Sequence, residues 1–573
     1  MIEQSRSRRL FSSVRPLILA FALMPALACS QQAVLHNECP SSSLDNVNSI
    51  TKCRAILPFA SSGRTQKVRS YPGIPSPVGL VPTAIMPEVP SGANRQAFPY
   101  DPRTIAPSVP ASWPAEEEAG AYFVDRYHPD ATDTNNPFGY PNKPRVTIPS
   151  SARGPNASYV EIHGSGREYK QQSPEYRLGR NEIVSAGQAQ APAFWLCVGG
   201  PWIGGKVSVR GQHVIFDGCK FQNEDTNPTI PHITIGPGAQ FVTLRNNEFR
   251  GQGTPIGGGT GQIINIAGQK DELVEFVMIY NNVISGGGDW TADHKKDIHA
   301  VRPLYWARYI WILENDISHV QGDLIQTGNS SNRNPDPAQR SHYIYIGGNH
   351  LYEAFENALD NKNSFHVILS SNEIHDFGNA RTGTAVILSN NDEGRYTGYH
   401  WAVYNEIYNV TGGAIRFSGD QDGEKTFAVG NYIHNVDDGI RLADHSGTAD
   451  HDSWVVGNTI RNCTNRGIGF GRGAGTNLYV RSNTTIDCWE HVEDRSRFKH
   501  AELSNHWSFN SNGSRTHVST SSYDVVGRNS FDRQSVVADE SGVDSDPVYR
   551  LFESIYGVSL FSAIDDRSSD SAQ

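Results

Sequence analysis

An aspartate and a lysine stand two positions apart in the middle of the chain, as Asp360 and Lys362, and Glu356 shortly precedes them. On a strand, alternate residues point from the same face, so the two side chains would lie together. A deprotonated amine can remove a proton from carbon, and carboxylates bind hard cations such as Ca²⁺. Beside Asp360 alone the amine would stay protonated, because an opposite charge favours the ammonium form. A Ca²⁺ ion on Asp360 would cancel that attraction and free the amine of Lys362 to act as a base.

Similar segments along the chain carry further polar residues at matching places. Alternation of faces puts Ile298, Ile325, Leu359, Ile415, Ile440 and Ile468 inside the protein. Their outward neighbours include His299, Gln326, Arg416 and Arg441. A strip with two arginines would attract a linear polyanion even on an acidic protein. We expect Gln326, Arg416 and Arg441 to bind substrate, and His299, with an ordinary pKa of about 6.5, to be the reserve base.

A long insertion lies just before His299, with the sequence SGGGDWTADHKKDIHAVRP. Its aspartates at 289, 293 and 297 offer oxygen ligands for Ca²⁺, although their spacing matches no twelve-residue calcium loop. Trp290, in the same segment, is a candidate for stacking on sugar rings. The insertion is expected to lie beside a substrate groove.

A repeat must position these residues. A short string with a central asparagine recurs nine times, at intervals of 23 to 35 residues. The asparagines are Asn247, Asn282, Asn315, Asn349, Asn372, Asn405, Asn431, Asn458 and Asn483. An apolar strand precedes nearly every one and a second follows about ten residues later, with no helical period. A sandwich would not return the same asparagine in each unit. The repeat therefore predicts a solenoid of parallel turns about 4.8 Å apart, in which each amide bonds the amides above and below.

The cysteines agree with this stacking. Cys463 and Cys488 each lie five residues after a repeated asparagine, which puts them on neighbouring turns within disulfide reach. Cys197 and Cys219, 22 residues apart, follow the same reasoning. Cys39 and Cys53 form a third local pair. Three disulfides suit an oxidising compartment, and six reduced, mostly buried thiols are the alternative.

The ends of the chain differ from the repeat. Residues 1–28 have the cationic start, short apolar run and small residues of a signal peptide. The segment ending at Cys29 resembles a bacterial lipoprotein box, which implies lipidation of Cys29 and an exported, outer membrane-anchored protein, and simple secretion is the alternative. Residues 29–120 are rich in proline and predict an extended stalk. The solenoid is expected over 121–490, and the aromatic segments of 491–573 are expected to cap its open end.

At about ten turns between residues 194 and 488, this all-β solenoid resembles the right-handed parallel β-helix superfamily, which contains pectate lyases, alginate lyases and polygalacturonases. The string from Glu356 to Ser364, followed by VILSSNEI, resembles the catalytic-lysine turn of the polysaccharide lyase family of chondroitinase B and certain alginate lyases. That resemblance implies Ca²⁺ on the acidic residues Glu356 and Asp360, Lys362 as the base, and an arginine one turn later that assists catalysis. The sequence departs from it at Asn357 and Leu388, so Arg416 would have to serve from one turn further on.

A net charge of -11 argues against nucleic acid as the partner, because phosphate contacts need a basic face. We expect cleavage of an acidic, uronate-containing polysaccharide by β-elimination. A non-catalytic adhesin and a uronate C5-epimerase remain open. So does a polygalacturonase-like hydrolase, for which Asp437 with Asp438 and Asp444 with His445 are the candidate residues.

Overall fold

The computed structural model describes residues 68–81, 95–109, 120–166, 174–183, 187–222, 231–251, 261–291, 297–328, 339–377, 383–389, 398–417, 424–442, 451–470, 476–493, 498–512, 516, 518, 524–526, 530–531 and 546–560. All of them belong to one compact unit that begins at Ser61. No helix among these residues is long and apolar enough to cross a membrane.

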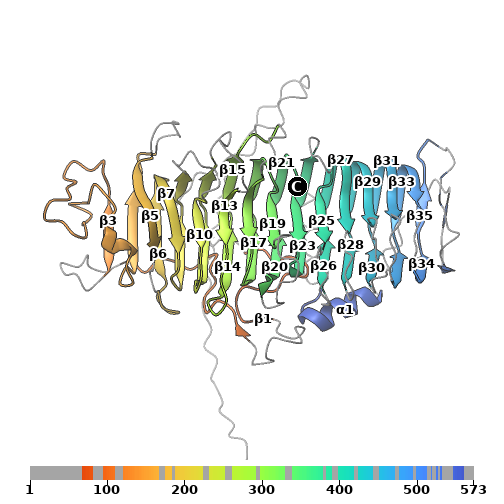
Figure 1. Cartoon of the computed structure of the whole chain (residues 1–573), viewed down its shortest axis with the longest axis horizontal. Coiled ribbons are helices and arrows are strands. Elements are labelled where there is room, and N and C mark those ends of the chain that lie inside the picture. The colour runs from red at the N-terminus through yellow and green to blue at the C-terminus, as the bar shows by residue number, and fades with distance from the viewer. Residues whose placement is uncertain are drawn as a thin grey trace, which may run out of the picture. The chain divides into compact units, whose positions relative to one another are not determined.

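The first of two long sheets has fifteen strands, each hydrogen-bonded in parallel to the next. Figure 1 shows them side by side along the solenoid. Its strands are β3 (Ala121–Val124), β4 (Tyr159–His163), β6 (Ala193–Val198), β8 (Val214–Asp217), β11 (Gln240–Arg245), β14 (Val274–Tyr280), β17 (Ala307–Leu313), β20 (His342–Gly347), β23 (Phe365–Ser370), β26 (Tyr399–Val403), β28 (Lys425–Val429), β30 (Asp452–Val456), β32 (Asn477–Arg481), β34 (His500–Ser504) and β36 (Asp524–Val526).

The second long sheet has twenty strands, and its pairings are also parallel. Its strands are β5 (Tyr176–Ile183), β7 (Trp202–Val209), β9 (Lys220–Gln222), β10 (Ile233–Ile235), β12 (Glu248–Arg250), β13 (Gly261–Ile266), β15 (Val283–Gly287), β16 (Ile298–Pro303), β18 (Asp316–Val320), β19 (Ile325–Gly328), β21 (His350–Ala354), β22 (Leu359–Lys362), β24 (Glu373–Phe377), β25 (Val386–Ser389), β27 (Glu406–Phe417), β29 (Tyr432–Leu442), β31 (Thr459–Phe470), β33 (Thr484–Val492), β35 (Trp507–Phe509) and β37 (Ser530–Phe531).

From β4 onward the chain alternates between the two sheets, so each turn adds one strand to the first sheet and one or two to the second. From β27 onward the two strands of a turn merge into one that bends at a register shift between Val410 and Gly413. Connections between parallel strands are almost always right-handed. The fold is therefore the right-handed parallel β-helix that the repeat predicts. Smaller elements are the pair β1 (Leu80–Val81) and β2 (Arg95–Gln96), a 3₁₀-helix (Ser150–Arg153) and helix α1 (Pro547–Tyr556).

The repeated asparagines form the predicted ladder along this solenoid. The side-chain oxygen of Asn282 accepts from the backbone N–H of Asn247 at 2.9 Å and from its side-chain amide at 3.1 Å. The same two hydrogen bonds join each later asparagine of the repeat to the next one, up to the last at Asn483. All nine side chains are buried. The residue before each one turns the backbone through the left-handed region, as at Asn281 (φ 51°) and Ser371 (φ 55°), which creates the bend.

The interior of the solenoid is a continuous column of Ile, Val, Leu and Phe side chains. Five of the six residues predicted to point inward belong to it; they are Ile325, Leu359, Ile415, Ile440 and Ile468. The sixth, Ile298, is buried outside that column. Apolar stacking of successive turns thus supplies the main stabilising burial of the fold.

A second apolar cluster lies on the outer side of the first sheet, where two expectations about the chain ends are corrected. Tyr71, Ile74 and Phe98 pack there, so this part of the proline-rich region is docked against the solenoid and is no free stalk. Helix α1 packs on the same side, away from the open end of the solenoid (Figure 1). Its Phe552 ring lies edge-on to Trp401 of β26, with ring centroids 4.7 Å apart. Both segments carry aromatic side chains that bury this apolar face of the sheet.

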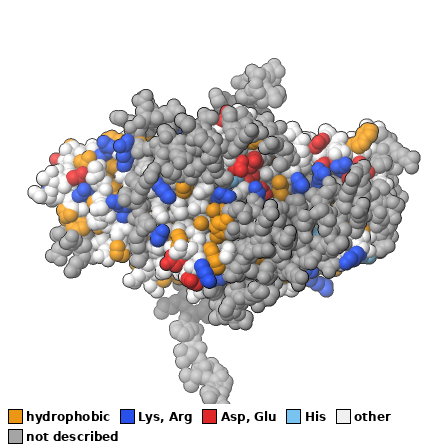
Figure 2. Space-filling view, in the orientation of Figure 1, with side chains coloured by type: hydrophobic (Ala, Val, Ile, Leu, Met, Phe, Trp, Pro, Cys, Tyr) orange, Lys and Arg blue, Asp and Glu red, His pale blue; other side chains and the backbone are white. Residues whose placement is uncertain are grey.

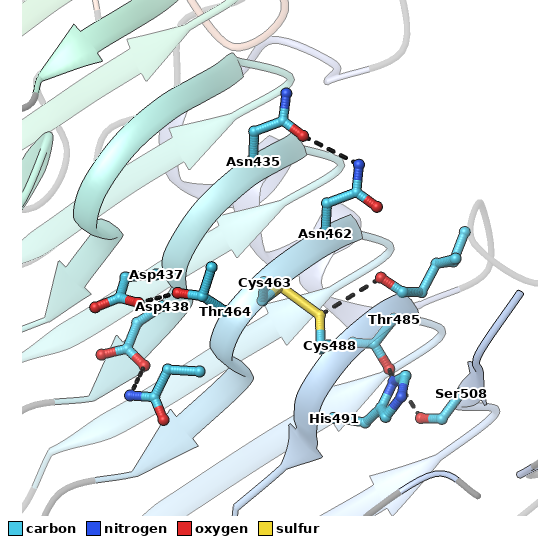
Figure 3. The surroundings of a disulfide bond; sticks show 12 residues. Asn435, Asp437, Asp438, Asn462, Cys463, Thr464, Thr485, Cys488, His491 and Ser508 are labelled. Carbon is cyan, nitrogen blue, oxygen red and sulfur yellow. Dashed lines mark hydrogen bonds between the residues drawn. A yellow bond between two sulfur atoms is a disulfide. The ribbon is translucent and has the colours of Figure 1, made fainter. Parts of the chain in front are cut away.

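Two disulfides connect neighbouring turns as the spacing predicts. Cys197 is bonded to Cys219, and Cys463 is bonded to Cys488, its direct register partner between β31 and β33 (Figure 3). Cys29, Cys39 and Cys53 lie outside the described residues.

Candidate functional site

Ionisable side chains from three successive turns converge at the second sheet. His299 comes from β16, Asp323 from the residues just before β19, and Asp360 and Lys362 from β22. Glu356 lies in the bend between β21 and β22. We call these five residues the acidic cluster. Parallel pairing positions them, because Val301 is in register with Ile325 and Ile325 with Leu359.

The side chain of His299 is fully buried, which corrects the expectation that it points outward to solvent. Its Nδ1 accepts a hydrogen bond of 3.0 Å from the backbone N–H of Asp323 and lies 3.2 Å from Oδ2 of that residue. Its Nε2 makes no hydrogen bond. A Cβ at Gly322 would lie 2.8 Å from Nδ1, so glycine leaves room for the ring. Burial lowers the pKa of His299 to about 3, and the imidazole is neutral at physiological pH.

Asp323 is the hub of the buried part of the acidic cluster. Its side chain accepts from the Gln326 amide at 2.9 Å and from the backbone N–H of Asn357 at 3.2 Å. Gln326 is itself 2% exposed, so this contact replaces the predicted one with substrate. Burial is the largest cause that raises the pKa of Asp323, to about 6. The carboxylate therefore orients Gln326, and the backbone N–H of Asp323 orients His299.

Asp360 and Lys362 form an ion pair of 2.9 Å at the more exposed edge of the cluster. Burial and the charge of Asp323 raise the pKa of Asp360 to about 6, against the opposing effect of Lys362. Burial alone would lower the pKa of Lys362, but Asp360 and Asp323 outweigh it and raise that pKa above its ordinary value. Lys362 thus carries its proton at neutral pH, which is the state predicted for this lysine beside Asp360 without a metal ion.

Glu356 has the most perturbed carboxyl group of the acidic cluster. Burial, followed by the charges of Asp323 and Asp297, raises its pKa to about 8. At neutral pH Glu356 is consequently a neutral acid close to carboxylates that are mostly ionised. Pairs of carboxyl groups whose pKa values are pushed apart in this way are typical of acid–base catalysis.

The acidic cluster contains a possible metal site, but the ligands that it brings together suit Ca²⁺ poorly. The three side chains of the cluster that lie close enough to share one ion are His299, Asp323 and Glu356, and Asp360 is not among them. Calcium takes six to eight oxygen ligands, whereas this group offers two carboxylates and an imidazole. The Nδ1 lone pair of that imidazole is already taken by a backbone N–H. Asp360 is occupied by Lys362.

The register of the turns confirms one column of outward residues and corrects its membership. Gln326, Asp360, Ile387, Arg416 and Arg441 follow one another across β19, β22, β25, β27 and β29. Ile387 faces outward and Leu388 points into the core. His299 does not belong to this column. Val301 is in register with Ile325, so the residue one turn before Gln326 in the column is Arg302.

The cationic residues of this column lie close to acidic ones. Figure 2 shows Lys and Arg side chains over the strands β27 to β31, with acidic side chains nearby. Arg441 lies 3.9 Å from Asp438, whose other oxygen lies 3.5 Å from Arg466. Asp438 also accepts from Asn465 and Asp437 from Thr464, and both aspartates are seen in Figure 3 beside the disulfide. The hydrolase candidates Asp437 and Asp438 are thus engaged in contacts between turns.

The insertion before His299 is described at its two ends. Trp290 packs edge-on against His319 of β18, with ring centroids 5.2 Å apart. Asp289 accepts from the backbone and hydroxyl of Thr291. Asp293, Asp444 and His445 lie outside the described residues.

Two residues of the site received no role from sequence reasoning. Asp323 is the first residue of the strand segment DLIQT. The available signal was a charged residue directly before Leu324, which points into the core. Arg302 is half-buried, its Nε makes no hydrogen bond, and burial lowers its pKa. With respect to the described residues, this Nε–H is a donor that remains available to an anion.

Comparisons with known proteins concern the fold alone. No family model matches the chain, and no curated protein is significantly similar. Among solved structures, the chain is similar to PfbA, a surface adhesin of Streptococcus pneumoniae, at 12% identity and a TM-score of 0.36 over 60% of this chain and 84% of that one. It is also similar to the periplasmic alginate epimerase AlgG (13%, 0.33, 65% and 76%) and to pectate lyase Pel9A (11%, 0.29, 75% and 84%).

Proposed function

We propose that this protein is an enzyme that cleaves an acidic, uronate-containing polysaccharide by β-elimination at the acidic cluster. The observation that carries the proposal is the difference in pKa between Glu356, about 8, and Asp360, about 6, beside the protonated Lys362. At pH 7 this arrangement offers an acid, a base and a cation in one place.

The three residues have separate roles in the reaction. The ammonium of Lys362 neutralises the substrate carboxylate, which makes the neighbouring C5 proton more acidic. The carboxylate of Asp360 removes that proton. Glu356 gives its proton to the departing glycosidic oxygen at C4 as the C4–C5 double bond forms. Lys362 therefore acts as a charge and not as the base, and no step needs Ca²⁺.

The column of outward residues supplies binding beyond the reacting sugar. Arg302 stands one turn before Gln326, and Arg416 lies two turns beyond Asp360, about 10 Å away at the spacing of parallel strands. Arg441 adds a further cation on the next turn. This spacing suits successive carboxylates of a linear polyanion lying along the solenoid.

Hydrolysis is a second candidate, and the protonated Glu356 specifically favours it. A hydrolase also pairs a carboxylic acid with a carboxylate, the acid protonating the leaving oxygen and the carboxylate activating water. The same two residues would then act without need of a uronate. The two reactions differ in their products, because elimination leaves a conjugated double bond and hydrolysis does not.

Export and anchoring at Cys29 remain part of the proposal. The signal-like residues 1–28 and Cys29 support it, as does the presence of two disulfides in the described chain. An acidic polysaccharide outside the cytoplasm is a consistent substrate.

The proposal is tested by offering purified protein pectate, alginate and glycosaminoglycans. Ultraviolet absorbance reports the unsaturated product, and a reducing-end assay reports every chain break. We expect both signals with at least one polymer and neither with Lys362→Met. Lys425→Met is a matched control, because Lys425 pairs with Asp452 at 3.3 Å in the other sheet. Reducing ends without absorbance would indicate the hydrolase, and altered uronate stereochemistry without chain breaks would indicate an epimerase. Polymer binding without any of these changes would indicate an adhesin.

A further inference from the structure

A second group of ionisable residues lies on the outer face of the second sheet, away from the strands that carry the acidic cluster. His350 is on β21, and Glu373 and His375 are on β24, the next turn. Glu373 is the register partner of His350, and His375 is the register partner of Tyr352. All three side chains are half-buried, and one ligand atom from each lies within 4.8 Å of the others.

The two imidazoles face each other through the same atom. Nε2 of His350 lies 2.7 Å from Nε2 of His375. On the opposite side of each ring, Nδ1 contacts a carboxylate: Asp316 at 3.2 Å for His350, and Asp376 at 2.7 Å for His375. A carboxylate accepts only, so each Nδ1 carries the proton in a neutral ring. Each Nε2 then presents a lone pair, so the contact of 2.7 Å requires a shared proton, or a metal ion that replaces this proton at a longer separation.

Hydrogen bonds to the surrounding residues hold these groups in place. Tyr352 donates to Asp316 at 3.2 Å, and Asn409 donates to Asp376 at 3.1 Å. The hydroxyl of Tyr408, one turn further along, donates to Glu373 at 3.0 Å. Imidazoles whose second nitrogen is bonded to an anchored carboxylate are the usual arrangement around a bound metal ion, since the carboxylate fixes the tautomer and raises the basicity of the ligand atom.

We propose that His350, His375 and Glu373 form a Zn²⁺ site that joins two turns of the solenoid. Two imidazole nitrogens, one carboxylate oxygen and a water molecule make the four-coordinate, tetrahedral set that zinc prefers. Zinc-bound nitrogens at about 2.0–2.1 Å from the ion lie roughly 3.3 Å apart in a tetrahedron. The two rings therefore need to separate by roughly 0.6 Å when the ion binds. A borderline metal such as zinc suits this mixed nitrogen and oxygen set, whereas Ca²⁺ requires oxygen ligands.

This site is independent of the proposed reaction. Its residues belong to the row β18, β21, β24 and β27, whereas the acidic cluster belongs to β16, β19 and β22. Zinc bound there would connect β21 to β24 through side chains, in addition to their backbone hydrogen bonds. Its expected effect is on the stability of these two turns.

Titration of the full chain with zinc chloride, followed by calorimetry, tests the proposal. We expect one ion per chain, a zinc-dependent rise in the unfolding temperature, and at least a hundredfold weaker binding in His350→Gln and in His375→Gln. The control is His319→Gln, because His319 contacts Glu353 at 2.8 Å in the same row without a second imidazole. Co²⁺ bound to the wild type should show the intense visible bands of a tetrahedral site. Absence of zinc binding to the wild type, or unchanged affinity in both histidine variants, would overturn the proposal.

Discussion

Asp360 and Lys362 occupy alternate positions on β22 and form an ion pair of 2.9 Å. This contact decides the chemistry available at the site, because it keeps the lysine charged and leaves the carboxylate with a raised pKa of about 6. A lysine in this state can bind an anion but cannot remove a proton. The carboxylate beside it can.

Replacing Lys362 by methionine should remove most of the activity. The substrate carboxylate would no longer be neutralised in the transition state, so we expect kcat/KM to fall by roughly a hundredfold or more. Lys362→Arg should retain part of the activity, since it keeps the charge. Initial rates on the responsive polymer measure this effect, and equal losses in the methionine and arginine variants would show that charge is not what Lys362 provides.

The pH profile of kcat/KM should be bell-shaped. Asp360 must be ionised to accept a proton, so activity falls as pH drops below about 6. Glu356 must be protonated to donate one, so activity falls as pH rises above about 8. Glu356→Gln should lower the rate and remove the alkaline limb. If the alkaline limb stayed in that variant, the acid would have to be another group.

Stability should also depend on pH through Glu356. Its pKa is raised from 4.5 to about 8 in the folded protein, so the folded state binds this proton more tightly than the unfolded chain. The resulting stabilisation is complete below pH 4.5 and is lost as the pH rises to about 8. Urea unfolding of Glu356→Gln should therefore show a flatter fall between pH 6 and 8 than the wild type. Glu353→Gln, three residues earlier, removes a half-buried glutamate that contacts His319 and should behave like the wild type. An equally steep fall in Glu356→Gln would contradict the prediction.

The solenoid could be predicted because an asparagine makes the same buried hydrogen bonds at every bend. A buried amide such as Asn372 satisfies the backbone of the turn before it and is satisfied by Asn405 of the turn after it, so asparagine returns at every bend. The disulfide between Cys463 and Cys488 followed from the same count of residues after the bend.

The side-chain directions were harder to predict. A shift of one residue moves every side chain of a strand to the other face. The segment from Val386 to Leu388 is apolar throughout, so alternation could not reveal that Ile387 faces outward. The position of His299 depended on the length of the insertion before it, and the proline content of the N-terminal region concealed the docking of Tyr71 and Phe98.

Asn372→Ala should destabilise the protein strongly. The change leaves the backbone N–H and the side-chain amide of Asn349 without their acceptor, and a buried unpaired polar group costs about 1–3 kcal/mol. We expect a loss of about 2–4 kcal/mol in the free energy of unfolding. Asn435→Gly is the matched control, because Asn435 bonds its neighbour at the exposed surface (Figure 3) and glycine keeps its left-handed backbone. Similar losses in the two variants would contradict a special role for the buried ladder.

Phe552→Ala should loosen helix α1 from the flank of the solenoid. Phe552 is fully buried against Trp401, and removal of a buried phenylalanine side chain costs about 3–5 kcal/mol. We expect limited proteolysis to cleave near α1 in this variant before the solenoid itself is cut. Replacement of the exposed Glu553 by alanine should leave the cleavage pattern unchanged. Wild-type resistance in Phe552→Ala would show that the helix does not depend on this contact.

The mass of the products tests the central proposal most directly. A uronate polymer that the wild-type protein shortens should be digested and its oligosaccharides analysed by mass spectrometry. We predict that each new non-reducing end is lighter by one water than the end that hydrolysis leaves, and that Lys362→Met and Glu356→Gln release little of this product. Products that retain the full water, or unsaturated products formed equally well by both variants, would contradict elimination at the acidic cluster.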